Sequence, residues 1–131
     1  MGKRFFKVLM PAMSLLILVF LVSCAKPSHQ VYFKVSGVSN STDIIYSIFA
    51  SGSDALINNW ADHGDITVSS LPWTSDTITV KQGEVASLSV DIYDSLSQSP
   101  AVTMEIYSDG SVVKSTTCSG AGASTTMQMT F

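Results

Sequence analysis

Hydrophobic and polar residues alternate along most of the chain after residue 30. The first such stretch places Val31, Phe33 and Val35 on one side, with Tyr32 and Lys34 on the other. A period of two is typical of β-strands that have one buried face. The clearest alternation runs from residue 85 to residue 93, where the apolar side carries Ala86, Leu88, Val90 and Ile92. The other side carries serines and Asp91, and we expect it to face solvent.

Further short segments complete the pattern. Residues 44–49 are apolar on both sides, which predicts a central strand, and residues 65–68 and 76–83 predict shorter strands. In 101–118 the pattern predicts a hairpin that turns at Asp109-Gly110, because this dipeptide supplies the positive φ of tight turns. Its inward residues, Val102, Met104 and Ile106, would oppose the Leu88 face. A last strand alternates Met127, Met129 and Phe131, whereas 54–60 predicts a helical turn or loop.

About seven short strands at a spacing of roughly ten residues predict an all-β fold. We expect a two-sheet β-sandwich, immunoglobulin-like, that follows an N-terminal signal helix. The expected organisation is a lipoprotein signal peptide over 1–23, a lipidated tether over 24–30 and the β-sandwich over 31–131.

The N-terminal segment carries the features of an export signal. Lys3, Arg4 and Lys7 precede an apolar run over 8–22, and the run is shorter than a comfortable membrane-spanning helix needs. It ends in Leu-Val-Ser-Cys, which looks like a lipobox. The thiol of Cys24 would then carry a diacylglyceryl group and the new N-terminus a further acyl chain, a firm membrane anchor. The alternative is an uncleaved signal anchor with an incidental cysteine.

Charge and cysteine content narrow the function classes. The mature part, residues 24–131, holds all ten acids but only four bases, a net charge of about −6 (4 − 10). Scattered acids and few bases argue against a nucleic-acid partner, because binding phosphates requires clustered Lys or Arg. If Cys24 is lipidated, Cys118 has no partner within the chain. It would be a buried free thiol or an intermolecular link, and burial is the commoner state.

Catalytic and metal-binding motifs are scarce. The sequence has no Gly-x-Ser-x-Gly elbow and no paired-cysteine zinc spacing, so we expect neither an enzyme nor a cofactor. Asp62, His63 and Asp65 could hold a cation or could form a solvated turn. Trp60 and Trp73 could bind a glycan or lipid, or could be structural, as tryptophans in small sandwiches commonly are.

Several short strings resemble the MmpS family of small, exported, membrane-anchored proteins. The positions that carry the resemblance are Tyr32, Gly37, Leu71, Pro72, Trp73, Asp109, Gly110, Val113 and Lys114. The resemblance implies an immunoglobulin-like sandwich that assists RND-type transporters of lipids and drugs. Two features depart from the family. A lipobox stands in place of its transmembrane helix, and Met104 stands where it often has a disulfide-bonded cysteine.

These observations predict a lipid-anchored, non-enzymatic accessory or interaction module of the cell envelope, which could assist an RND-type transporter. Membrane attachment through Cys24 is the one partner contact that the residues specify. In a cell with two membranes, Ala25 after the lipidated cysteine favours the outer membrane. The alternative function is a glycan- or lipid-binding β-sandwich module.

Overall fold

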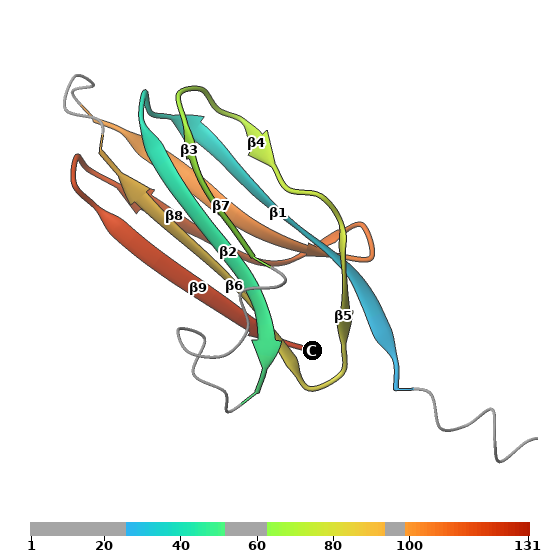
Figure 1. Ribbon diagram of the computed structural model, residues 1–131. Helices are drawn as coiled ribbons and strands as arrows, with labels where there is room; N and C mark the ends of the chain where they lie inside the picture. Colours follow the sequence, from blue (N-terminus) through green and yellow to red (C-terminus); the bar gives the residue numbers. More distant parts are fainter. Residues whose placement is uncertain (1–25, 52–62, 94–98) are drawn as a thin grey trace, which may run out of the picture.

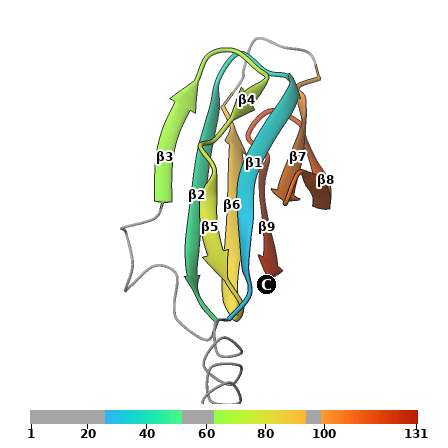
Figure 2. The ribbon, with the colours of Figure 1, turned by 90° about the vertical axis from the view of Figure 1, so that its right-hand side faces the viewer.

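The computed structural model describes residues 26–51, 63–93 and 99–131, which form two antiparallel β-sheets. The strands are β1 (Ser28–Val38), β2 (Thr42–Ala50), β3 (His63–Val68), β4 (Trp73–Thr74), β5 (Ile78–Lys81), β6 (Glu84–Ile92), β7 (Ala101–Ser108), β8 (Ser111–Ser119) and β9 (Ser124–Thr130). Figure 1 shows the strands, and Figure 2 looks roughly onto the faces of the sheets, with β3, β2, β6 and β9 following one another from left to right.

The first sheet has the order β4-β1-β7-β8, with β5 also paired to β1, and the second has the order β3-β2-β6-β9. The chain changes sheet after β1, β3, β5, β6 and β8. The predicted fold class, an all-β two-sheet sandwich, is confirmed, and the described residues contain nine strands rather than about seven. In a constant-type immunoglobulin domain the first two strands share a sheet. Here β1 and β2 lie in different sheets, so the two-layer architecture agrees with an immunoglobulin domain but the order of the strands differs from the constant type.

The inward faces of the two sheets form one hydrophobic core. Val31, Phe33 and Val35 of β1 are wholly buried, as the alternation predicts. The Leu88 face of β6 and the Met104 face of β7 are also buried and belong to the same core cluster. The central position predicted for residues 44–49 is confirmed too, because β2 lies between β3 and β6.

The outer face of β6 is less exposed to solvent than the sequence predicts. Val85 and Ser87 point away from the core but are only 7% and 8% exposed. Strand β6 lies between β2 and β9, and Ser87 has Ser47 and Gln128 as its cross-strand neighbours. A small side chain between two paired strands is shielded by them, so our expectation of a solvated Ser87 is wrong. Ser89, two residues on, is half-buried and hydrogen-bonds Thr126.

The β7–β8 hairpin turns where the sequence predicts. Asp109 and Gly110 have φ values of 51° and 83°, and Ser108 pairs with Ser111 across the turn. Positive φ at both central residues defines a type I′ turn, whose twist matches that of the flanking strands. The pairing register shifts between Ile106 and Tyr107, so one residue of β8 is unpaired near the turn.

Several chain segments meet at one end of the sandwich. The N–H of Gln82 in the β5–β6 turn donates to the Pro27 carbonyl, just before β1. The next N–H, of Gly83, donates to the carbonyl of Phe131. The start of β1, the β5–β6 turn and the C-terminus therefore share this end, as Figure 1 shows. The segment 54–60, predicted as a turn or loop, lies outside the described residues.

Candidate functional site

Two tyrosines stack on the outer face of the first sheet. Strands β1 and β7 are paired so that Tyr32 lies opposite Tyr107, and Lys34 lies opposite Glu105. The two tyrosine rings are 4.5 Å apart between centroids and inclined by 11°. Cross-strand aromatic pairs of this kind stabilise a sheet, and each ring covers one face of the other, which leaves the opposite faces and the ring edges for further contacts.

An open groove of about 410 Å³ runs beside these rings. It lies between the tyrosine pair and the segment that connects β4 to β5. Its lining combines two aromatic side chains, three hydroxyls and one ammonium group, from Tyr32, Lys34, Thr74, Ser75, Thr77 and Tyr107. We call this depression the tyrosine groove.

Ser75 forms part of one wall of the groove. It lies in the break between β4 and β5, yet it still hydrogen-bonds to β1. Its N–H donates to the Phe33 carbonyl (3.0 Å), and its Oγ accepts from the Phe33 N–H (2.9 Å). The side chain thus replaces a backbone acceptor between β4 and β5. The wall beside β1 is consequently a short non-strand segment, residues 75–77, whose backbone at Ser75 is held in place.

Two polar groups of the groove differ in what they offer a ligand: the proton of the Tyr107 hydroxyl is already engaged, whereas the Lys34 ammonium group can donate. The Tyr107 hydroxyl donates to Glu105 Oε2 (3.2 Å). Desolvation raises the pKa of Tyr107 above its ordinary value, and the neighbouring Glu105 carboxylate raises it further, so the phenol stays protonated at neutral pH. Within the described part of the chain no carboxylate forms an ion pair with Lys34, so its ammonium group is available to a ligand.

A larger depression, of about 620 Å³, lies between the edge strands β8 and β9. Its one charged group, the Lys114 ammonium, already donates to the Gln128 carbonyl (2.7 Å). A lysine on an exposed carbonyl of an edge strand protects that edge from pairing with another chain. This depression has no aromatic lining, so the tyrosine groove is the better candidate site.

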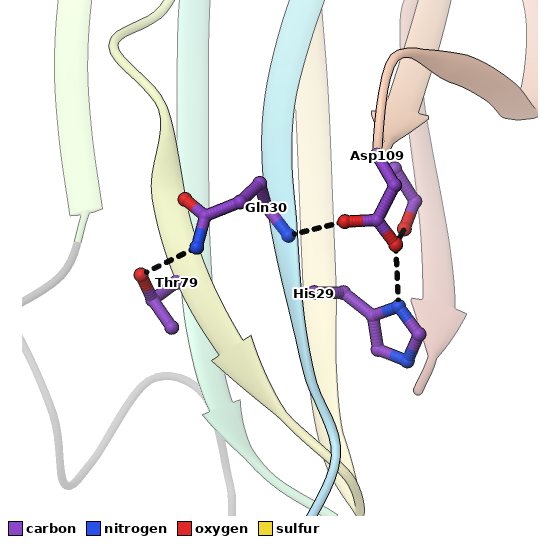
Figure 3. Close-up of polar contacts among 5 residues, drawn as sticks. His29, Gln30, Thr79 and Asp109 are labelled. Atoms are coloured by element: carbon purple, nitrogen blue, oxygen red, sulfur yellow. Dashed lines mark hydrogen bonds and ion pairs between the residues drawn. The ribbon is translucent and has the colours of Figure 1, made fainter.

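A separate polar cluster joins the start of β1 to the β7–β8 turn (Figure 3). Asp109 Oδ2 lies 2.8 Å from His29 Nδ1, and Oδ1 accepts from the Gln30 N–H at 2.9 Å. The Gln30 amide in turn donates to Thr79 Oγ1 of β5. The Gln30 N–H, followed by the His29 hydrogen bond, lowers the pKa of Asp109 below its ordinary value. The cluster connects β1, β5 and the β7–β8 turn, and it is a structural junction.

Trp73 occupies a structural position in the described residues. Its ring is half-buried against the core and lies 5.5 Å from Tyr46, which in turn lies 5.4 Å from Phe33. Gly64 of β3 permits this cluster, because a Cβ there would overlap the Tyr46 ring. Trp60, the other predicted binding residue, lies outside the described residues, so the two are not brought together by anything that the structure describes.

Of the remaining predicted site residues, some lie in the described part of the chain and others lie outside it. Cys24 and Asp62 lie outside the described residues, and Asp65 is exposed on β3. Among residues 26–51, 63–93 and 99–131, no three His, Cys, Asp or Glu side chains are grouped to hold a metal ion. Cys118 is buried and free, in agreement with the burial expected for it.

No protein-family model matches the chain, and no curated protein is significantly similar to it. Within the part of the chain that the structure describes, there is no helix with the length and apolar character to cross a membrane.

The tyrosine groove was not predicted from the sequence. The alternation correctly placed Tyr32 outward, but the pairing of β1 with β7 joins residues about 75 positions apart. A local period of two cannot reveal such a pairing. The sequence did contain one indication of this site. Two predicted strands each carry a tyrosine on the outward face, where polar residues are usual.

Proposed function

We propose that this protein is a lipid-anchored, non-enzymatic interaction module of the cell envelope. The observation that carries the proposal is the close junction between the lipobox and the sandwich. The basic head, the apolar run and Cys24 are followed by only three residues before Ser28 begins β1. An anchored Cys24 would therefore hold the domain against the membrane surface.

Chain geometry gives this arrangement a scale. Four residue steps from Cys24 to Ser28 span at most about 14 Å when fully extended. The start of β1, the β5–β6 turn and the C-terminus would then face the lipid headgroups. The ten residue steps of β1, from Ser28 to Val38, place the opposite end up to about 34 Å farther out.

The outer end of the sandwich is suited to contact with another envelope protein. Val38 at the end of β1 is 66% exposed, and Tyr93 after β6 is 61% exposed. Both flank the β1–β2 turn, because the Tyr93 N–H donates to the Ser41 carbonyl. Together with the resemblance to MmpS proteins, this apolar tip supports an accessory role beside an RND-type transporter.

Replacement of the lipobox cysteine tests the anchor. Cys24→Ala should abolish lipidation and leave an uncleaved precursor, because the thiol is the acceptor of the diacylglyceryl group. Intact-mass measurement and membrane fractionation of the expressed full chain would show this. Cys118→Ala is the matched control and should leave maturation unchanged. Wild-type mature protein without lipid mass would refute the anchor.

The accessory role can be tested in the same membranes. A photo-crosslinking residue at Val38 should capture a membrane protein that one at Thr117, on the exposed face of β8, does not. Mass spectrometry of the captured band would identify whether it is a transporter. Capture from neither position, or equally from both, would count against a partner at the tip.

The tyrosine groove favours a second candidate function, which is the binding of a glycan or lipid. Here the contact surface would be the outer face of the first sheet rather than the tip. Ligand binding at the groove does not depend on the anchor, so the two candidates can be tested separately.

A further inference from the structure

We propose that the tyrosine groove binds a short segment of a saccharide chain. This inference rests on the second candidate function, ligand binding at the outer face of the first sheet, and names the class of ligand. A face of the Tyr32–Tyr107 pair that the partner ring does not cover would stack on the sugar, and Lys34 with the Thr74 and Thr77 hydroxyls would bind the sugar hydroxyls.

The aromatic pair provides a rigid apolar surface of suitable chemistry. Sugar rings carry C–H groups on their faces, and these pack against the electron-rich face of an aromatic ring. The stacking of Tyr32 on Tyr107 restrains both rings before a ligand arrives. Such restraint reduces the conformational entropy that binding would otherwise lose.

The polar lining complements a ligand that both donates and accepts hydrogen bonds. Thr74 and Thr77 contribute hydroxyls that can donate and accept, and Lys34 contributes only donors. The Ser75 hydroxyl already donates to the Asp76 carbonyl and accepts from the Phe33 N–H, so it can offer a ligand only an acceptor. Sugar hydroxyls and ring oxygens match this mixture. The volume of about 410 Å³ falls within the range of about 300–1,000 Å³ typical of small-molecule sites.

The same lining argues against the other ligands of an envelope protein. A lipid chain requires aliphatic walls, and none of the six lining residues is aliphatic. A proline-rich peptide binds across grooves that are mainly aromatic and apolar. Here the two aromatic rings stack on each other, so they form one surface beside a polar wall rather than two ridges with a slot between them.

Titration of the full mature chain with defined oligosaccharides tests the proposal. The protein should be kept in a zwitterionic detergent, because alkyl-glycoside detergents would themselves compete as sugars. The probes are chitohexaose, cellohexaose and hexagalacturonate, with binding followed by calorimetry. At least one should bind saturably to the wild type, and hexagalacturonate binding should fall on Lys34→Met, because its carboxylates would lose the ammonium group that the groove provides.

Matched variants locate the binding. Tyr32→Ala should weaken it about tenfold or more, which corresponds to about 1.4 kcal/mol. Thr77→Arg, at an exposed rim position, should block the groove without disturbing the core. The controls, Tyr93→Ala and Thr130→Arg, place the same changes at exposed sites outside the groove. Both should bind as the wild type does.

Three outcomes would overturn the proposal. They are no saturable binding to any of the three oligosaccharides, equal losses in the groove and control variants, and binding of a decaproline peptide in place of every sugar. Thermal unfolding of each variant identifies a loss that is due to misfolding, and Thr77→Arg then decides the case alone. Cys24→Ala should retain sugar binding, so failure of the anchor is distinguishable from failure of the groove.

Discussion

At the scale of single residues, Thr42 stands out among the described residues because its buried side chain lacks a hydrogen-bond partner. It begins β2 and is wholly buried, yet its hydroxyl has no hydrogen-bond partner among the described residues. Ser39, also buried and three positions earlier, donates its hydroxyl to the Ser41 carbonyl. A buried hydroxyl without a partner costs about 1–3 kcal/mol of stability relative to water.

Replacement of Thr42 should therefore stabilise the protein. Thr42→Val keeps the β-branched shape and exchanges the hydroxyl for a methyl group, so the free energy of unfolding should rise by about 1 kcal/mol. Urea unfolding would measure it. Thr67→Val is the control, because Thr67 is exposed and its hydroxyl donates to Asp43, and it should give no gain. A less stable Thr42→Val protein would show that the hydroxyl has a favourable contact.

At the scale of elements, the local sequence pattern predicted the positions of the strands and their buried faces. It predicted less well which strands pair with each other. The alternation located the buried faces of β1, β6 and β7, because side chains alternate sides along any strand. The Asp-Gly pair located the hairpin turn, since its positive φ values are a local requirement. Strand pairing depends on the whole chain, so the burial of Ser87 between β2 and β9 could not be predicted.

The same distinction applies to the candidate site. Trp73 was singled out for its chemistry, but its contact with Tyr46 depends on β3 presenting Gly64 beside that ring. Tyr32 was assigned to the correct face, but its stacking on Tyr107 depends on the β1–β7 register. Residue type alone identified candidates for binding. Only the tertiary arrangement shows that Tyr32 and Tyr107 form a surface pair, whereas Trp73 packs against the core.

The faces of β6 can be compared directly by placing a charge on each. Leu88→Asp should cost several kcal/mol, because it loses about 2 kcal/mol of apolar burial and also buries an unpaired carboxylate. A domain of this size has about 5–15 kcal/mol of stability, so the variant should be largely unfolded or strongly destabilised. Denaturant midpoints would measure the change.

Ser89→Asp is the matched control, one position farther along the same strand. Ser89 points outward, and its partner Thr126 could still donate a hydrogen bond to the new carboxylate. The change should be no more than about 0.5 kcal/mol. Similar midpoints for Leu88→Asp and Ser89→Asp would mean that the two faces of β6 are assigned wrongly.

At the scale of the whole molecule, the end from which the tether leaves is held by several contacts. His29 and Gln30 of β1 bind Asp109 of the β7–β8 turn, and the His29 ring also lies 5.3 Å from that of Phe131. A domain anchored through Cys24 would transmit any pull to β1 first. These contacts connect β1 to a distant hairpin and to the C-terminus, so they would distribute that load over the first sheet and the end of β9.

The Asp109 junction should make stability depend on pH in acid. The Gln30 N–H and His29 lower the pKa of Asp109 in the folded state below its ordinary value of 3.8. The unfolded chain then binds the proton more readily, so the carboxylate contributes stability above about pH 4. That contribution is lost as pH falls from 3.8 through the lower folded-state pKa. Asp109→Asn, which retains an acceptor and tolerates the positive φ, should lack this contribution.

Urea midpoints of the wild type and Asp109→Asn between pH 2 and pH 7 would measure this difference. The wild type should be the more stable protein at neutral pH, and the two curves should converge in strong acid, where the wild-type carboxyl is also protonated. Asp76→Asn, at an exposed position between β4 and β5, is the control and should follow the wild type throughout. A constant gap between wild type and Asp109→Asn at every pH would show that the carboxylate charge contributes nothing. The junction would then depend on the shape of the turn alone.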